Sequence, residues 1–137
     1  MRRRYPELLA RLYRPYYWNR QGEHPPGDPI TNVNPVFQYD GTHLDGRVNR
    51  RLLQVGYELM NEPMDDEGVA ALDALFRVME DPETNFAFQL EAGQLQYLHN
   101  WRVVHQRSAY EDHDDPELKR HLVRIFLRDE GARSYMG

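Results

Sequence analysis

The chain of 137 residues has no cysteine, no long apolar run and no excess of basic residues, and each absence excludes a class of protein. Without cysteine there is no disulfide, zinc-thiolate site or cysteine nucleophile, which fits a reducing cytoplasm. The apolar run that follows the basic residues 2–4 covers only residues 8–10, so we expect no secretory leader and no membrane partner. The net charge of −5 argues against nucleic acid as a partner.

The remaining composition is that of an ordinary globular protein. Hydrophobic residues make up 40% and charged residues 28%, which argues against disorder. The length suits one small domain, so residues 1–137 are expected to form a single domain. Nine tyrosines and two tryptophans suit large packed surfaces or a lined pocket.

The first 80 residues carry helical patterns and one hairpin pattern. Apolar residues at helical spacing predict helices over residues 6–12, 49–59 and 65–80, with Asp65 as the N-cap of the last. Strands over residues 36–39 and 42–48 are expected to flank a tight turn at Asp40-Gly41. Between these elements we expect an aromatic run over residues 13–18 and a Pro- and Gly-rich loop over residues 19–35.

The pattern changes to period two after residue 85. Alternating apolar residues predict four strands, with a turn at residues 91–94 and an acidic loop at 111–117; the strands cover residues 86–90, 95–99, 101–107 and 120–127. About six strands and two or three helices give an α+β class that is mainly β. The hairpin-like connections of the second half favour a jelly-roll sandwich.

Two of these strands carry residues suited to a chemical site. Alternation places His105 and Arg107 on one face of their strand, and Arg120 and Arg124 on one face of the last strand. An inward guanidinium needs an anion and suits a carboxylate, and imidazole is a common ligand of non-haem iron. Two simpler interpretations remain open at this point. His105 could be a structural histidine, and the two arginines could pair with the acidic loop.

A resemblance favours the chemical interpretation. The segment has Gly93-Gln94, His99-Asn100, HQRSAYED at residues 105–112 and RHLVRIFLR at residues 120–128. It resembles the C-terminal strands of the TauD/TfdA family of Fe(II)- and 2-oxoglutarate-dependent dioxygenases. The gamma-butyrobetaine hydroxylase-like branch is also similar. Upstream, the similarity extends to LLARLYRP at residues 8–15 and RVNRR at residues 47–51, so it covers the chain but only the C-terminal part of the family.

The resemblance implies a fold, two cofactors and three site residues. The fold would be the C-terminal portion of a double-stranded β-helix, a jelly roll. His105 would be the distal histidine of a 2-His-1-carboxylate iron site, and Arg120 would pair with the distal carboxylate of 2-oxoglutarate. Arg124 would be a second anion contact. Together with O2, such a site would hydroxylate a small-molecule substrate and release succinate and CO2.

The chain departs from the family in its metal ligands. The family's His-x-Asp pair lies upstream of the matching region, and two other His-x-Asp strings occur here, at residues 43–45 and 113–115. Neither aligns with the family's pair, so His43 and Asp45 are weak candidate ligands, and His113 and Asp115 are weaker ones. We therefore expect a C-terminal fragment that pairs with itself or with an N-terminal half. His24, His99 and His121 are expected to be structural or surface residues.

Three hypotheses follow from this pattern. In the first, the chain is the C-terminal half of a 2-oxoglutarate oxygenase. In the second, it is a non-catalytic jelly-roll fragment that binds a carboxylate ligand or a partner chain. In the third, it is a complete small metalloprotein in which His43, Asp45 and His105 form a rebuilt triad.

Overall fold

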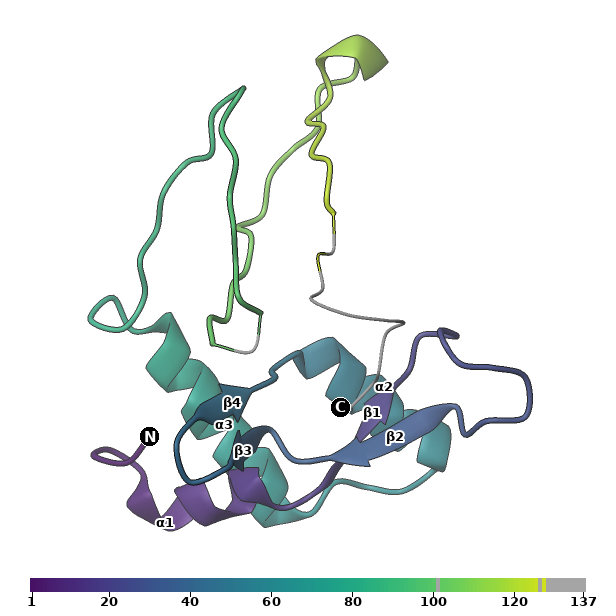
Figure 1. The fold of residues 1–137 in the computed structure, drawn as a ribbon, viewed down its shortest axis with the longest axis vertical. Helices are drawn as coiled ribbons and strands as arrows, with labels where there is room; N and C mark the ends of the chain where they lie inside the picture. The colour runs from purple at the N-terminus through teal and green to yellow at the C-terminus, as the bar shows by residue number, and fades with distance from the viewer. Residues whose placement is uncertain (101, 126, 128–137) are drawn as a thin grey trace. The chain divides into compact units, whose positions relative to one another are not determined.

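The computed structural model describes residues 1–100, 102–125 and 127. The chain divides into two units, the first spanning Met1–Val104 and the second beginning at His105. The first unit (Figure 1) contains, in chain order, α1 (Pro6–Leu9), the 3-10 helix η1 (Ala10–Tyr13), β1 (Tyr16–Asn19), β2 (Thr31–Asn34), β3 (Phe37–Tyr39), β4 (Leu44–Gly46), α2 (Arg50–Met60) and α3 (Asp66–Glu80). In its described residues the second unit holds the 3-10 helix η2 (Pro116–Leu118). Trp101, Phe126 and Arg128, which belong to the predicted strands and motif, lie outside the described residues.

The first pair of strands lies where we expected an aromatic run and a loop. Strands β1 and β2 are antiparallel, with Trp18 opposite Asn32, and the loop between them is confined to residues 20–30. Pro15 and Pro35 flank the two strands from outside, which fits proline's missing N–H group. The expected loop was therefore too long, because its two ends pair with each other.

The predicted hairpin around Asp40-Gly41 is confirmed. Strands β3 and β4 pair antiparallel, with Tyr39 opposite Leu44. Asp40 Oδ1 accepts hydrogen bonds from the backbone N–H groups of Thr42 and His43 at 2.8 and 2.7 Å. Gly41 has a φ of +96°, a conformation that residues with a Cβ rarely adopt.

The two predicted long helices are also confirmed, together with the cap of the second. Asn49 Oδ1 accepts from the N–H of Leu52 at 3.1 Å at the start of α2. Asp65 Oδ1 accepts from the N–H of Gly68 at 2.8 Å at the start of α3. Each bond satisfies one of the N–H groups that a helix start leaves unpaired. The predicted first helix is realised as α1 followed by η1.

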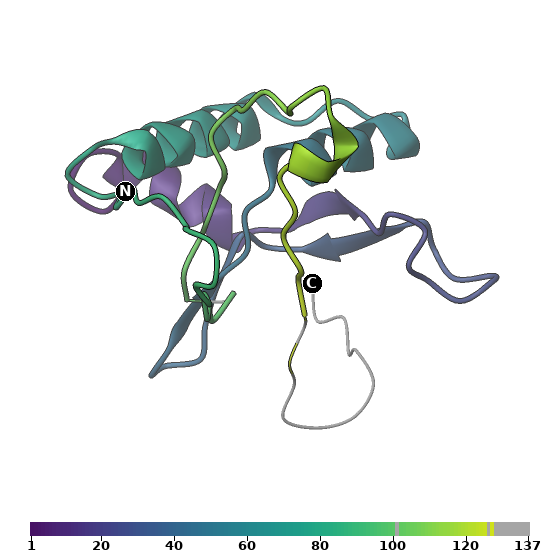
Figure 2. The same ribbon diagram turned by 90° about the horizontal axis from the view of Figure 1, so that it is seen from above.

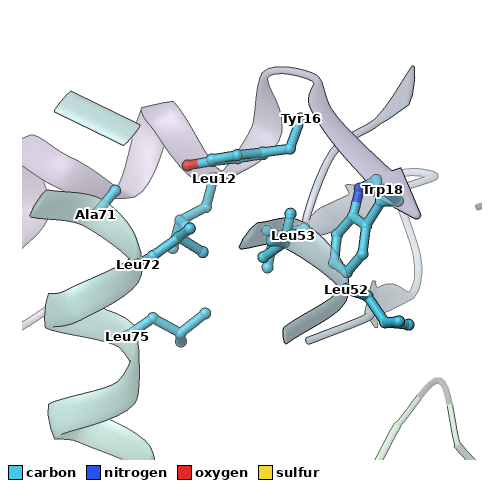
Figure 3. Packing of buried hydrophobic residues seen from close by; sticks show 9 residues of the cluster. Leu12, Tyr16, Trp18, Leu52, Leu53, Ala71, Leu72 and Leu75 are labelled. Carbon is cyan, nitrogen blue, oxygen red and sulfur yellow. The ribbon is translucent and has the colours of Figure 1, made fainter. Parts of the chain in front are cut away.

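The core of the first unit joins the two long helices to β1 and η1 (Figure 3). Trp18 and Leu12 are fully buried, and Ala71, Leu72 and Leu75 of α3 point toward Leu12 and Leu53. Helix α2 lies along the β1–β2 pair in both views of the ribbon (Figures 1 and 2).

Gly56 allows the close approach of α2 to β1. A Cβ at this position would lie 2.4 Å from the carbonyl oxygen of Tyr17 and 2.9 Å from the backbone nitrogen of Trp18. Distances this short are not found for real Cβ atoms, and backbone atoms of a paired strand cannot easily shift. The absence of a side chain at Gly56 therefore determines how near the helix lies to the strand.

The four strands predicted in the second half do not form in the described residues. Residues 86–90, 95–99, 102–107 and 120–125 have no strand pairing. None of the described residues from 82 to 127 is buried, and the alternating Phe86, Phe88, Leu95 and Tyr97 are exposed. Alternating apolar residues are not sufficient for a strand to form, because a strand also needs a neighbouring strand with which its backbone can form hydrogen bonds.

The class is α+β, with three α-helices and two two-stranded antiparallel sheets in the described part. The prediction that the chain is mainly β is wrong for these residues, where helical residues outnumber strand residues. No closed barrel is present among them. Within the same residues, no helix has the length and apolar content needed to cross a lipid bilayer.

Candidate functional site

The predicted site residues His105, Arg120 and Arg124 all lie in the second unit. All three are exposed, and none belongs to a helix or strand. Because no strand forms in the described residues of this unit, alternation alone does not tell which side chains face the same way. The contacts of each side chain must decide which of these residues come together.

Tyr110 brings two arginines of the HQRSAYED and RHLVRIFLR motifs to one place. The guanidinium carbon of Arg107 lies 4.2 Å from the centre of the Tyr110 ring, and that of Arg120 lies 5.2 Å from it. Both distances fall within the range of about 6 Å for a cation–π interaction. Since one ring contacts both groups, the two charges lie within about 10 Å, roughly one Debye length at 0.1 M salt.

The acidic segment over residues 111–117 does not neutralise these two arginines. Within residues 105–125 and 127, neither Arg107 nor Arg120 forms an ion pair. Asp115 instead caps η2, where its Oδ1 accepts from the N–H of Glu117 at 3.0 Å. The backbone N–H of Asp115 donates to His113 Nδ1 at 3.0 Å. The alternative in which Arg120 pairs with the acidic loop is therefore wrong for the described residues.

The weaker candidate ligands His43 and Asp45 lie in and beside β4 of the first unit. His43 Nδ1 is 3.6 Å from Asp40 Oδ2, and Asp45 forms an ion pair with Arg102 at 3.1 Å. The backbone N–H groups of His43 and Thr42 lower the pKa of the Asp40 carboxyl. Each candidate thus already lies close to another polar side chain in the same unit.

A buried arginine that we did not expect lies at the centre of the first unit. Arg11 in η1 is 4% exposed, and its Nε and Nη2 atoms donate to the carboxylate of Asp65, the shorter bond being 2.6 Å. Arg11 Nη1 also donates to the carbonyl oxygen of Pro15 at 3.2 Å. These contacts of Arg11 with Asp65 and Pro15, the Arg11–Asp65 cluster, therefore link the start of α3 to η1 and to the segment before β1.

Two groups of this cluster have strongly shifted pKa values. The hydrogen bonds from Arg11 lower the pKa of Asp65 to about 2. Burial raises the pKa of Tyr16 to about 12, and the Arg11 guanidinium lies 3.9 Å from the centre of its ring. The Asp65 shift thus comes from its pairing with Arg11, and the Tyr16 shift comes from burial. In the sequence, only the predicted N-cap position of Asp65 pointed to this cluster. Arg11 lies in an apolar helical segment, and nothing in the sequence indicated that its side chain is buried.

Helices α2 and α3 border a cleft of about 730 Å³. Its apolar lining includes Leu53, Tyr57, Met64 and Leu72, and its polar lining includes Arg50 and Asp73. Arg50 and Asp73 form an ion pair at 2.9 Å. The cleft can accept an apolar group, but its lining contains no histidine that could ligate a metal.

Comparison with protein families matches residues 1–126 to the family described as "Taurine catabolism dioxygenase TauD, TfdA family". The chain belongs to this family. The TauD/TfdA match includes both arginine-bearing segments around Tyr110, together with His105. The resemblance on which the sequence analysis relied is thereby confirmed.

The chain is also similar to FR-33289 synthase of Streptomyces rubellomurinus. The two are 30% identical over 133 residues, which is 95% of this chain and 39% of the synthase. The chain therefore spans about two-fifths of the length of this relative.

An iron site of the TauD/TfdA kind needs two histidines and one carboxylate on a common face. Among residues 1–100, 102–125 and 127, no group of three or more His, Asp or Glu residues is placed to hold a metal ion. His105 has no hydrogen-bond partner in this part of the chain that would orient its imidazole. The described residues thus do not by themselves fit the metal, and His105, His43 and Asp45 stay predictions as ligands.

Proposed function

We propose that this chain contributes the C-terminal part of a non-haem Fe(II)/2-oxoglutarate-dependent dioxygenase domain. The observation that carries the proposal is the TauD/TfdA match over residues 1–126, which includes His105 and Arg120 in their motifs. Residues 1–137 would form a single partial domain, whose exposed alternating segments become strands of a jelly roll when neighbouring strands are supplied. The reaction would be hydroxylation of a small molecule, with consumption of O2 and release of succinate and CO2.

Three residues have distinct roles in this proposal. His105 would provide one of three iron ligands through a neutral imidazole nitrogen. Arg120 would bind the distal carboxylate of 2-oxoglutarate, because a guanidinium presents a fork of donors that fits both oxygens. Arg124 would contact a second anionic group, either of the co-substrate or of the primary substrate. The other ligands would come from a His-x-Asp pair on a further segment, and a cytoplasmic location is kept as a sequence-based prediction.

The exposed apolar residues support association with that further segment or with a second copy of the chain. Phe86, Leu95, Val123 and Ile125 are each at least 75% exposed. Apolar side chains at period two along unpaired backbone form a surface to which another strand can add. We therefore expect self-association of the isolated chain and its suppression when the complementary segment is present.

A second candidate function is a non-catalytic fragment that binds a carboxylate or a partner chain. The specific observation in its favour is that no three-ligand group occurs in the described residues, while Arg107 and Arg120 still converge on Tyr110. Carboxylate binding without oxygen-dependent turnover, also in the presence of a complementary segment, would select this alternative.

The test is release of succinate from 2-oxoglutarate under oxygen by the chain co-expressed with a TauD/TfdA segment that carries the His-x-Asp pair. We expect succinate from the wild-type complex, none from the chain alone and none from a complex with His105→Ala. His121→Ala is the matched control, since His121 is an exposed histidine in the same unit. Equal succinate release by the His105→Ala and wild-type complexes would exclude the proposed ligand.

A further inference from the structure

We infer that Arg107, Tyr110 and Arg120 form one carboxylate-binding cluster, in which Arg107 is a second binding residue beside Arg120. The inference rests on the proposed function, which assigns a carboxylate to Arg120, and extends it to a residue that the family resemblance does not assign. The observation behind it is the convergence of both guanidinium groups on the Tyr110 ring, at 4.2 and 5.2 Å.

The two arginines of the cluster have like charges close together. Two guanidinium groups that share one ring repel each other, and the ring itself carries no net charge to offset that repulsion. The motif region offers nearby carboxylates at Glu111, Asp112 and Asp115, yet within the described residues none of them forms an ion pair with either arginine. The cluster therefore keeps two positive charges whose repulsion a bound anion would relieve.

The two guanidinium groups have hydrogen-bond donors left for a ligand. Arg107 uses one donor in a marginal hydrogen bond, from Nη1 to the carbonyl oxygen of Ser108 at 3.5 Å. Arg120 has no hydrogen bond within the described residues. Each guanidinium carries five N–H donors in a planar fork, so most donors of the pair remain for a ligand. A carboxylate accepts two such forks more readily than a single-oxygen ligand does.

Tyr110 positions the two arginines. Tyr110 is 44% exposed, so it is no core residue of the second unit. By attracting both cations, the ring reduces the number of conformations that two long side chains sample before a ligand binds. Tyr110 is thus a positioning residue, and its aromatic ring rather than its hydroxyl group is the part that acts.

The experiment is calorimetric titration of the purified chain with 2-oxoglutarate and with succinate, without metal. We expect Arg107→Gln and Arg120→Gln each to weaken binding about tenfold, which is the loss expected for one charged hydrogen-bonding partner. In the double variant the second substitution should weaken binding by less than it does alone, because both residues hold the same group. Arg14→Gln is the control for a lost positive charge, since Arg14 pairs with Glu67 in the first unit.

Two further variants separate positioning from a direct contact. Tyr110→Phe keeps the ring and should bind as tightly as the wild type, whereas Tyr110→Leu should weaken binding as the arginine variants do. Equal effects of Tyr110→Phe and Tyr110→Leu would overturn the role given to the ring. A competition with inorganic phosphate completes the series, and equal affinities for phosphate and succinate would overturn the assignment of a carboxylate.

Failure of this inference can be distinguished from failure of the proposed function. Wild-type binding in Arg107→Gln with weakened binding in Arg120→Gln would overturn the cluster and leave the oxygenase proposal standing. The cluster would also be overturned if the wild-type chain bound no dicarboxylate. Conversely, loss of binding in both arginine variants, with no succinate released by the complemented chain, would support the cluster and refute the oxygenase.

Discussion

Residues 1–80 and the described residues from 82 to 127 both contain alternating apolar side chains, but only the first region buries them. In the first, Tyr16 and Trp18 alternate on β1 and are 1% and 0% exposed. In the second, Phe86 and Phe88 alternate in the same way and are 86% and 54% exposed. The difference is that β1 has β2 beside it and α2 across it, whereas residues 86–88 have no strand partner. Period two therefore predicts which face a strand would bury, and the available neighbours determine whether a strand forms.

The largest effect on stability is expected when one aromatic residue is replaced in each region. Trp18→Ala should lower the free energy of unfolding by about 3–5 kcal/mol, because a fully buried ring is removed from the core. Phe86→Ala should change it by less than about 0.5 kcal/mol in the isolated chain. Urea denaturation measures both values. A loss for Phe86→Ala as large as that for Trp18→Ala would mean that the second region is packed in solution.

A somewhat smaller effect is expected at the contact between α2 and β1. Gly56→Ala should destabilise the chain by about 1–3 kcal/mol, because the new methyl group would press on the backbone of Tyr17 and Trp18. The control is Gln54→Ala in the same helix, at an exposed position where alanine is tolerated. Thermal unfolding of both variants gives the comparison, and a neutral or stabilising Gly56→Ala would contradict the close approach.

The Arg11–Asp65 cluster should make the first region sensitive to acid. Asp65→Ala removes the N-cap of α3 and the partner of Arg11, and should lower stability by about 1–2 kcal/mol at pH 7. Since the pKa of Asp65 is depressed to about 2 in the folded state, its contribution is present above the unfolded value of about 4. It is lost as pH falls toward 2.

Denaturation of wild type and Asp65→Ala at several pH values checks this dependence. The difference between them should be constant above about pH 5 and should shrink progressively below about pH 4. Gln54→Ala, at an exposed position in α2, is the control for the loss of a side chain that carries no titratable group. If the difference in free energy of unfolding between wild type and Asp65→Ala stayed the same down to pH 2, the stabilisation by Asp65 would not depend on its charge.

The smallest expected effect concerns the hydroxyl group of Tyr16. This oxygen is buried and has no hydrogen-bond partner among the described residues. Tyr16→Phe should therefore leave stability unchanged or raise it by up to about 1 kcal/mol at pH 7, because an unpaired polar group is removed. Since the folded pKa is raised to about 12, wild-type stability should fall as pH rises above 10, and Tyr16→Phe should fall less steeply. Tyr97→Phe, at an exposed site, is the comparison.

The elements that the sequence predicted correctly are those with local determinants. Asn49 and Asp65 cap helices through bonds to residues three positions on, and Asp40-Gly41 closes a hairpin of neighbouring residues. The β1–β2 pair was missed because residues 20–30 intervene and their prolines favoured a loop. The strands after residue 85 were predicted from alternation alone, which says nothing of a partner.

In the candidate site, too, local sequence motifs could be predicted and contacts between distant side chains could not. The motifs around His105 and Arg120 could be recognised from the sequence, and the family match covers both. The chain reversal at the acidic loop over residues 111–117 was predicted, but the shared contact of Arg107 and Arg120 with the Tyr110 ring was not, because it depends on tertiary placement of the three side chains. Arg11 was overlooked for a similar reason, because its partner Asp65 is distant in the sequence.

We propose that this chain carries part of an iron and 2-oxoglutarate site and that a second segment completes the site. The most direct test is an anaerobic Fe(II) titration in the presence of 2-oxoglutarate, following the metal-to-ligand charge-transfer absorption. We predict no saturable absorption for the chain alone and saturation at one iron per complex when the segment with the His-x-Asp pair is present. Saturation at one iron per isolated chain, or an unchanged absorption in a complex with His105→Ala, would contradict the claim.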